Sequence, residues 1–461
     1  MGNKPVVCFL PVTMKLFWQL YPQLEKQTTE LMETVKTKLE ERFDIINCDL
    51  IGNEDEAKAA IGKIKDKEFD LLVIWENGYV ASAIPSVVIE QLKELPIAFL
   101  VTQRDKSIPP DMDYARYMDS TAITSVMELG GVMARKNIYY ETFIGHMDDT
   151  DIFNRLERYA KAARAYTGIK NLKIGRIGYA YPGMLDICVD DASVSILGPK
   201  VDCITLSEVE EQLSSITDEQ VTGFMDEVKK ECDYSRIKED DFVKTVKLYK
   251  ALENIIVQKD LKALCVHDYE FLSIVSKTVS EFALSYLENR YGIATGVEGD
   301  MPNCISAFIA RAFSGQSPMF VDWTMFDEEE NAIFFQHNGK ADPAILNSPV
   351  LSPSAEPFGG VEGDAVVFEA AGKSGKVTML SMIYREDGWY IFAAEGEALE
   401  KEARPCRLNQ LTVRVNKPVK AFLEEVCRLG VGHHLNVAYT HFVPEIQYLA
   451  KIAGMKFITV K

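Results

Sequence analysis

This sequence has few histidines and no long apolar run. It contains 6 histidines in 461 residues, whereas a metal-dependent hydrolase usually needs a richer set of histidines and aspartates to hold and activate water. No stretch approaches the roughly 18 apolar residues of a transmembrane helix. The N-terminal stretch "MGNKPVVCFLPVTMKLFW" lacks the apolar core and cleavage site of a signal peptide. These absences disfavour a hydrolase, a membrane protein and a secreted protein.

Closely spaced cysteine pairs and a dinucleotide-binding motif are absent as well. The 9 cysteines run from Cys8 to Cys427 without a CxxC motif, and their odd number does not fit a disulfide framework. Reduced thiols in a cytoplasmic protein fit this usage better. No GxGxxG motif follows the first apolar run, so nucleotide binding has little support.

Basic residues are in deficit. The chain has 50 Lys and Arg against 69 Asp and Glu, a net charge of −19 at pH 7. Nucleic acids and anionic membranes attract basic surfaces, so neither is expected as a partner. The acidic residues are scattered, which is typical of solvated helix faces.

The first third of the chain alternates short apolar runs with helical patterns. The runs "VVCFL", "FDLLVIW" and "LPIAFLV" have the length and composition of buried strands. Between the first two, apolar or small residues recur at helical spacing, at Leu24, Thr28, Leu31, Val35 and Leu39. Strands that alternate with helices predict βαβ units and a parallel sheet. Ligands are expected in the loops after the carboxyl ends of such strands.

The character of the sequence changes near residue 321. A second α/β segment, which includes "LKALCV" (261–266), precedes this point, and short strands such as "KVTMLSMIY" and "GWYIFAAEG" follow it. The four residues "REDG" between those two strands predict a hairpin turn. The predicted fold class is α/β, with two Rossmann-like α/β domains followed by a β-rich C-terminal domain. The expected divisions are 1–168, 169–320 and 321–461.

Half of the histidines lie in one stretch, "VGHHLNVAYTH" (431–441). A single histidine is more often structural than a ligand, so carboxylates that could join it matter. Glu298 stands in "GVEGDMPN", an acidic turn before an apolar helix. Asp322 stands in "MFVDWT", where burial among apolar neighbours would be costly unless the carboxylate were paired or metal-bound; an edge-strand position is the alternative. A second "GVEGD" at 360–364 follows a Pro/Ser/Gly-rich loop, and we interpret it as a turn.

These three stretches resemble the L-fucose isomerase/L-arabinose isomerase superfamily, which interconverts aldoses and ketoses with a divalent metal, usually manganese. Its acidic ligands stand in a Glu-x-Asp motif before a helix and in a Phe-x-Asp-like strand, as in "EGDMPN" and "FVDWT". The 24-residue separation of Glu298 from Asp322 is similar to the fucose branch. The spacing of His434 and His441 matches the C-terminal histidine pair of that branch. The resemblance therefore implies that Glu298, Asp322 and His434 bind Mn²⁺ or another divalent cation.

Other stretches combine features of both branches. "FFQHNGKADPAIL" supplies His337 where the arabinose branch has a further metal-binding histidine, so His337 is a candidate fourth ligand or a sugar contact. The resemblance implies that His433, which replaces an asparagine of the fucose branch, lines the sugar pocket. "GYAYPGM" resembles the substrate loop and places Met184 near the sugar. "IWENGY" places Trp75 as an aromatic sugar contact, often made across a subunit boundary.

The resemblance implies an aldose–ketose isomerase that acts on an open-chain sugar through an enediol intermediate, with Glu298 and Asp322 as acid–base residues. It also implies homo-oligomers, commonly hexamers. A non-catalytic sugar-binding or regulatory protein is the alternative, although a binding protein needs no two acids and a histidine at one junction. The substrate stays open among L-fucose, D-arabinose, L-arabinose and an unusual or acidic sugar.

Overall fold

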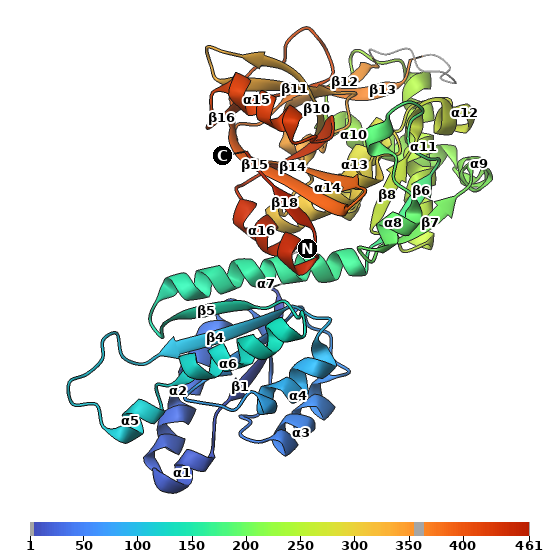
Figure 1. Cartoon of the computed structure of the whole chain (residues 1–461). Coiled ribbons are helices and arrows are strands. Elements are labelled where there is room, and N and C mark those ends of the chain that lie inside the picture. The colour runs from blue at the N-terminus through green and yellow to red at the C-terminus, as the bar shows by residue number, and fades with distance from the viewer. Residues whose placement is uncertain (1–3, 355–363, 461) are drawn as a thin grey trace. The chain divides into compact units, whose positions relative to one another are not determined.

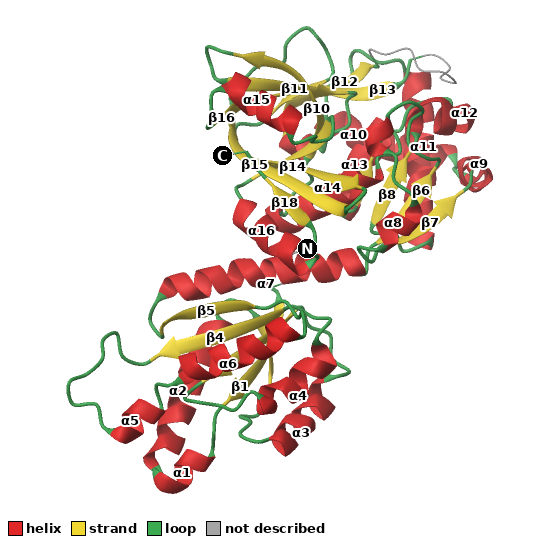
Figure 2. Ribbon diagram, viewed as in Figure 1, coloured by secondary structure: helices red, strands yellow, loops and turns green. Residues whose placement is uncertain are grey.

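The computed structural model describes residues 4–354 and 364–460 of the chain (Figure 1). The chain forms two compact units, Gly2–Thr167 and Gly168–Lys461. Both units mix helices with strands (Figure 2). Glu362, in the second "GVEGD" stretch, lies outside the described residues.

The first unit is built on a five-stranded parallel sheet with strand order β2-β1-β3-β4-β5. The apolar runs predicted as strands form its centre, and β3 is buried at every position. The strands are β1 (Val6–Val12), β2 (Asp44–Asn47), β3 (Leu71–Glu76), β4 (Ile97–Gln103) and β5 (Glu141–His146). The helices are α1 (Leu16–Leu20), α2 (Gln23–Glu40), α3 (Glu54–Ile64), α4 (Ala83–Leu92), α5 (Tyr114–Met118) and α6 (Ala122–Arg135).

Helix α2 confirms the helical periodicity seen in the sequence. Its buried positions are the predicted Leu24, Thr28, Leu31, Val35 and Leu39. Residues three and four apart share one face of a helix, so these side chains form one buried stripe.

The second unit begins within α7 (Thr150–Lys170) and contains a four-stranded parallel sheet of order β7-β6-β8-β9. Its strands are β6 (Lys173–Ile177), β7 (Lys200–Ile204), β8 (Ala263–Val266) and β9 (Ala294–Gly296). The helices are α8 (Asp191–Ser195), α9 (Leu206–Ser215), α10 (Asp218–Glu231), α11 (Glu239–Gln258), α12 (Ser273–Ser276), α13 (Glu281–Tyr291) and α14 (Met301–Ser314).

The C-terminal part of this unit is a nine-stranded sheet that closes on itself. Six antiparallel strands form the ring β16-β11-β10-β17-β14-β15, and β15 pairs again with β16. The predicted hairpin is confirmed, because Arg385 pairs with Gly388 between β14 and β15. The elements are β10 (Met319–Asp327), β11 (Ala332–His337), β12 (Leu346–Pro353), β13 (Val366–Gly372), β14 (Gly375–Arg385), β15 (Gly388–Ala398), β16 (Asn409–Val415), α15 (Val419–Arg428), β17 (His434–Tyr439), α16 (Val443–Ile452) and β18 (Lys456–Ile458).

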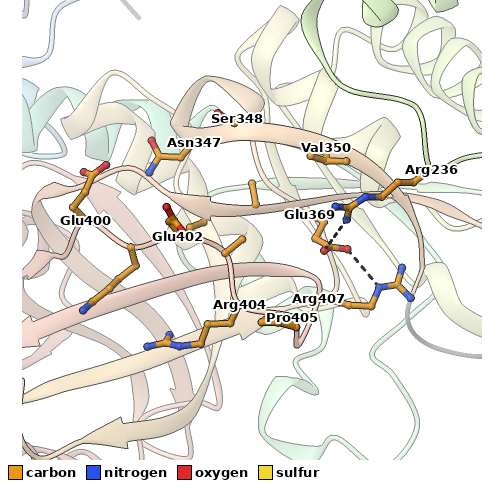
Figure 3. A pocket seen from close by; sticks show the side chains of 14 residues that line it. Arg236, Asn347, Ser348, Val350, Glu369, Glu400, Glu402, Arg404, Pro405 and Arg407 are labelled. Atoms are coloured by element: carbon orange, nitrogen blue, oxygen red, sulfur yellow. Dashed lines mark hydrogen bonds and ion pairs between the residues drawn. The ribbon is translucent and has the colours of Figure 1, made fainter.

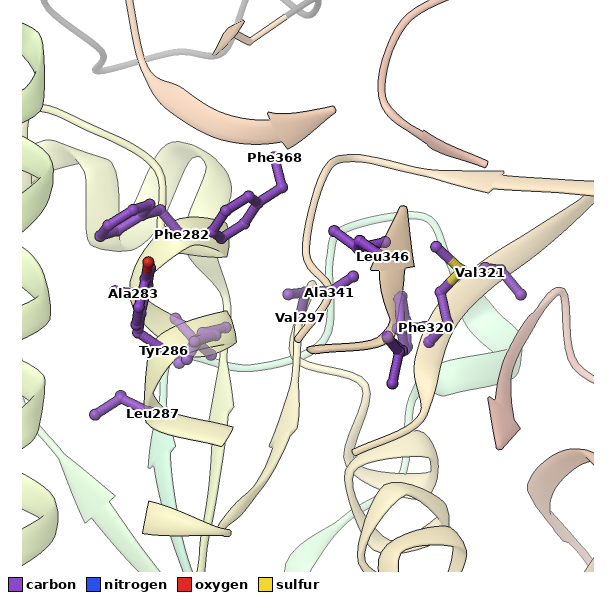
Figure 4. Close-up of a cluster of buried hydrophobic side chains, with 14 of the residues drawn as sticks. Phe282, Ala283, Tyr286, Leu287, Val297, Phe320, Val321, Ala341, Leu346 and Phe368 are labelled. Atoms are coloured by element: carbon purple, nitrogen blue, oxygen red, sulfur yellow. The ribbon is translucent and has the colours of Figure 1, made fainter. Parts of the chain in front are cut away.

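The parallel sheet and the barrel share one hydrophobic core. A single cluster of buried side chains runs from Ile177 to Val460. In Figure 4, Phe282 and Tyr286 of α13 lie beside Phe368 of β13, with ring centroids 5.7 and 5.9 Å from that of Phe368. The predicted boundary after residue 320 falls inside β10, and the parallel sheet and the barrel belong to one compact unit.

The predicted α/β class with a β-rich C-terminal part is confirmed in this coarser form. Two separate parallel sheets precede the barrel. Their identity as Rossmann-like domains stays a prediction. Among the described residues, none of the helices combines the length and the apolar character that a membrane span requires.

Candidate metal and sugar site

Glu298 lies in the short loop between β9 and α14, at the carboxyl end of the parallel sheet. Its backbone is left-handed, with φ of 56°, a strained conformation for a residue other than glycine. Two hydrogen bonds hold it there: the Glu298 amide donates to Asp268 Oδ1 over 3.0 Å, and the Tyr181 amide donates to the Glu298 carbonyl over 2.8 Å. The fold thus fixes the backbone that carries this carboxylate.

Asp322 and His434 come from neighbouring barrel strands and are directly opposed in the β10–β17 register. Directly opposed residues place their side chains on the same face of a sheet. His434 Nε2 consequently lies 3.6 Å from Asp322 Oδ1 and 3.0 Å from Glu298 Oε2. The Asp322 side chain is 37% exposed, so it avoids part of the cost that full burial among its apolar sequence neighbours would carry.

His337 is the last residue of β11, the strand on the other side of β10. Its Nε2 lies 4.0 Å from Glu298 Oε1. The ring of Phe320 packs against both imidazoles, with centroids 4.6 Å from His337 and 4.7 Å from His434. The structure therefore brings the predicted set of Glu298, Asp322, His337 and His434 to one place, although their roles stay predictions.

The donor groups fit a divalent cation. Two overlapping groups each offer three ligand atoms within 4.8 Å of one another: Glu298 with His433 and His434, and Asp322 with His337 and His434. Asp322 Oδ1 is buried and accepts no hydrogen bond, a costly arrangement unless a cation or another donor compensates it. Carboxylate oxygens with imidazole nitrogens and no thiolate suit Mn²⁺.

Opposing effects set the charges at the site. Burial favours the neutral acid of Glu298, but the hydrogen bond with His434 outweighs burial and holds the Glu298 pKa below the usual range. Burial lowers the pKa of His337, so this imidazole is neutral. A neutral imidazole and an ionised carboxylate are the forms that bind metals.

Asp300 is a site residue that the sequence analysis did not select. His434 Nδ1 donates to Asp300 Oδ2 over 2.9 Å, and Asp300 also caps α14 by accepting from the Asn303 amide. Burial lowers the pKa of His434, but Asp300 and Glu298 outweigh it and raise that pKa to about 10. The Glu-x-Asp motif could have indicated Asp300, because an aspartate at the start of a helix accepts a hydrogen bond from the helix backbone.

His433 is held by Asp186, a second residue that the sequence analysis missed. Both the His433 amide and its Nδ1 contact Asp186 Oδ2, over 3.2 and 2.7 Å. The His433 hydrogen bond is the main cause that lowers the pKa of Asp186 to about 2. Asp186 is 247 residues away in sequence, so no local pattern could have revealed the pair.

Met184 and Trp75, the other predicted sugar contacts, differ in placement. In the sequence, Met184 stands between Tyr181 and Asp186. The Tyr181 amide donates to the Glu298 carbonyl, and Asp186 contacts His433. Trp75 is in the first unit, where its side chain is fully buried and its Nε1 donates to Thr102 Oγ1 over 2.8 Å. This burial argues against the predicted sugar contact, because the Trp75 ring packs inside its own unit.

A cavity of about 940 Å³ lies beside β12 and β13, away from this site. Figure 3 shows Arg236 and Arg407 joined to Glu369 at its wall. None of the predicted site residues lines it. This cavity contributes nothing to the arrangement of the four converging groups.

Comparison with known proteins identifies relatives over most of the chain. A sulfoquinovose isomerase of Alkalicoccus urumqiensis is 22% identical over 330 residues, 70% of this chain and 72% of the relative. A sulfoquinovose isomerase of Priestia aryabhattai is 20% identical over 413 residues, covering 88% and 89%. An L-arabinose isomerase of Oceanobacillus iheyensis is 22% identical over 489 aligned positions, covering 98% and 100%. No family model matches the chain. The predicted resemblance to the L-fucose isomerase/L-arabinose isomerase superfamily is confirmed, and the chain is a homologue of sugar isomerases.

Proposed function

We propose that this protein is a metal-dependent aldose–ketose isomerase. The observation that carries the proposal is the convergence of Glu298, Asp322, His337 and His434 from four separate elements onto one point. Two carboxylates brought this close repel each other, and burial disfavours the charged form of every group at the site. A bound cation or shared protons would compensate both effects. We assign Mn²⁺, or another divalent cation, to this point.

A divalent cation there would polarise the carbonyl of an open-chain sugar. The two carboxylates supply the proton transfer. One would remove the proton from C2 and the pair would return a proton to C1, while the hydroxyl proton moves from O2 to O1 by way of the enediol intermediate. The lowered pKa of Glu298 keeps it ionised at neutral pH, as a general base requires.

We assign substrate binding to His433 and to the loop that carries Met184. The hydrogen bond from His433 Nδ1 to Asp186 leaves Nε2 available for a sugar hydroxyl. Both L-arabinose and sulfoquinovose isomerases are among the relatives, so neutral pentoses and a sulfonated hexose are the leading candidate substrates. The homo-oligomeric state and the cytoplasmic location stay part of this proposal.

The test is interconversion of a panel of aldoses and ketoses by protein stripped of metal and then given Mn²⁺. The panel includes L-arabinose, L-fucose, D-arabinose and sulfoquinovose. We expect Mn²⁺-dependent conversion of at least one sugar. Glu298→Gln should reduce the rate by about 10²–10⁴-fold, the usual contribution of a positioned acid–base group.

Glu397→Gln is the matched control, because Glu397 is an exposed barrel carboxylate that pairs with Arg414. It should leave conversion unchanged. Sugar binding by calorimetry without conversion, equal in the native chain and in Glu298→Gln, would favour a non-catalytic sugar-binding protein instead.

A further inference from the structure

The imidazole of His337 ends a chain of buried hydrogen bonds that the proposed chemistry does not use directly. His337 Nδ1 contacts Asn338 Oδ1 over 2.6 Å. Asn338 Nδ2 in turn donates to Glu281 Oε1 over 2.8 Å. Glu281 is fully buried at the start of α13. The chain thus joins a candidate metal ligand on the barrel to a carboxylate on a helix beside the parallel sheet.

The direction of each hydrogen bond follows from its chemistry. The Glu281 oxygen that faces Asn338 is an acceptor, so the NH₂ group of the Asn338 amide must point toward it. The amide oxygen therefore faces His337. An amide oxygen only accepts, so Nδ1 of the neutral His337 ring must carry the proton. This tautomer leaves the Nε2 lone pair on the side of Glu298.

We propose that Glu281 and Asn338 are positioning residues that fix His337 in the tautomer whose Nε2 binds the metal. The inference rests on the proposed metal site and deepens it. Metal-binding histidines usually donate their second ring N–H to an oxygen acceptor, which sets both the tautomer and the ring orientation. Here the acceptor is an amide, and the amide is itself oriented by a buried carboxylate.

Glu281 is also linked, through Asp268, to the backbone of Glu298. A hydrogen bond links Asp268 with Glu281, so one of these two acids carries a proton, and Asp268 Oδ1 accepts from the Glu298 amide over 3.0 Å. Asp268, like Glu281, is fully buried. The network consequently connects the backbone of Glu298 with the ring of His337, two candidate ligands that come from different sheets.

The first test uses metal affinity and imidazole tautomer rather than turnover. Free Mn²⁺ is counted by electron paramagnetic resonance in titrations of the purified chain. Histidine tautomers are determined by ¹⁵N NMR of the metal-free protein, where only 6 histidines contribute and His337→Gln assigns the relevant signal. Asn338→Ala should weaken Mn²⁺ binding by about 10–100-fold and remove the single Nδ1–H tautomer of His337.

Asn289→Ala is the matched control. Asn289 lies on α13, the helix that carries Glu281, and its amide donates to Asp342 Oδ1 over 2.8 Å, away from the candidate ligands. This variant loses one amide hydrogen bond at a more exposed position and should keep both the Mn²⁺ affinity and the His337 tautomer. An equal loss of affinity in Asn289→Ala and Asn338→Ala would mean a general packing effect and would overturn the inference.

A single and a double variant test which group donates and which accepts in the hydrogen bonds between His337, Asn338 and Glu281. Asn338→Asp places two carboxylates against each other and should weaken Mn²⁺ binding. Adding Glu281→Gln gives the introduced carboxylate a donor while that carboxylate still accepts from His337, so the double variant should regain most of the affinity. The absence of this rescue would contradict the assigned direction, even if Asn338→Ala proved unstable.

These readouts separate the inference from the proposed function. If the native chain converts no sugar, yet Asn338→Ala loses Mn²⁺ affinity and the tautomer, the positioning role stands and the isomerase proposal fails. If conversion is Mn²⁺-dependent but Asn338→Ala binds Mn²⁺ as the native chain does, the positioning role fails alone.

Discussion

His434 Nδ1 donates to Asp300 Oδ2 across 2.9 Å, between the first residue of a barrel strand and the residue that caps α14. This hydrogen bond directs the other ring nitrogen, Nε2, toward Glu298 and Asp322. The register of one strand and the capping of one helix thus act on the same imidazole.

Mn²⁺ binding should release a proton from His434. Asp300 and Glu298 outweigh burial and raise the pKa of this imidazole to about 10, so the metal-free protein holds it protonated at neutral pH. A metal must displace that proton from Nε2. Calorimetric titrations at pH 7.5 in buffers of different ionisation enthalpy should give about one proton released per ion. A binding enthalpy independent of the buffer would contradict this expectation.

Asp186→Asn should raise KM for the sugar more than it lowers kcat. The Asp186 carboxylate, whose pKa the His433 hydrogen bond lowers to about 2, is ionised at every working pH and holds both the amide and the ring of His433. Losing one charge-assisted hydrogen bond costs about 1.5–3 kcal/mol, or roughly a 10–100-fold weaker hold on the sugar. Steady-state kinetics measures the split. Asp191→Asn, which breaks the neighbouring pair with Arg176, should change neither constant.

Glu76→Gln should stabilise the first unit at alkaline pH. Glu76 is 1% exposed, and burial raises its pKa to about 7. The folded state binds this proton more tightly than the unfolded state, so stability falls as pH rises from the usual value near 4.5 through 7. The glutamine should therefore add about 3 kcal/mol at pH 8 and almost nothing at pH 4. Urea unfolding at the two pH values measures the difference, and an equal effect at both would refute the assignment.

Gly299→Ala should disturb the loop that carries Glu298. Gly299 has φ of 70°, and an added Cβ would lie 2.1 Å from the Tyr179 carbonyl oxygen. The substitution should cost about 1–3 kcal/mol of unfolding free energy and weaken Mn²⁺ binding as well. Gly223→Ala, on α10 with no atom within 4 Å of the added carbon, should instead stabilise by about 0.5–1 kcal/mol. Urea unfolding of the two variants provides the comparison.

Local sequence patterns predicted the helices and strands whose buried residues recur at a regular spacing or form one apolar run. The stripe on α2 and the runs that became β1, β3 and β4 are of this kind. The candidate ligands Glu298, Asp322 and His434 were also recognisable, because each stands in a distinctive local motif. These residues could be selected one at a time, without knowledge of what faces them.

The environments of the same residues could not be predicted in this way. The sequence left both a buried and an edge-strand position open for Asp322 and indicated that Trp75 would contact a sugar, whereas the structure half exposes Asp322 and buries Trp75 completely. Exposure depends on which strands and helices cover a side chain. A local motif does not indicate which strands and helices pack over its side chains.

The sequence by itself determined that this protein is α/β with a β-rich C-terminal part, because composition and periodicity are local properties. The resemblance of its motifs to a known family indicated which acids and histidines could carry its chemistry. Only the tertiary structure decided that β15 closes on β16, that Asp186 holds His433 and that Glu281 orients Asn338. Glu281 and Asn338 are 57 residues apart in the sequence, and Asp186 and His433 are 247 residues apart. Pairing at such distances follows from strand register and helix packing, which emerge only when the whole core is formed.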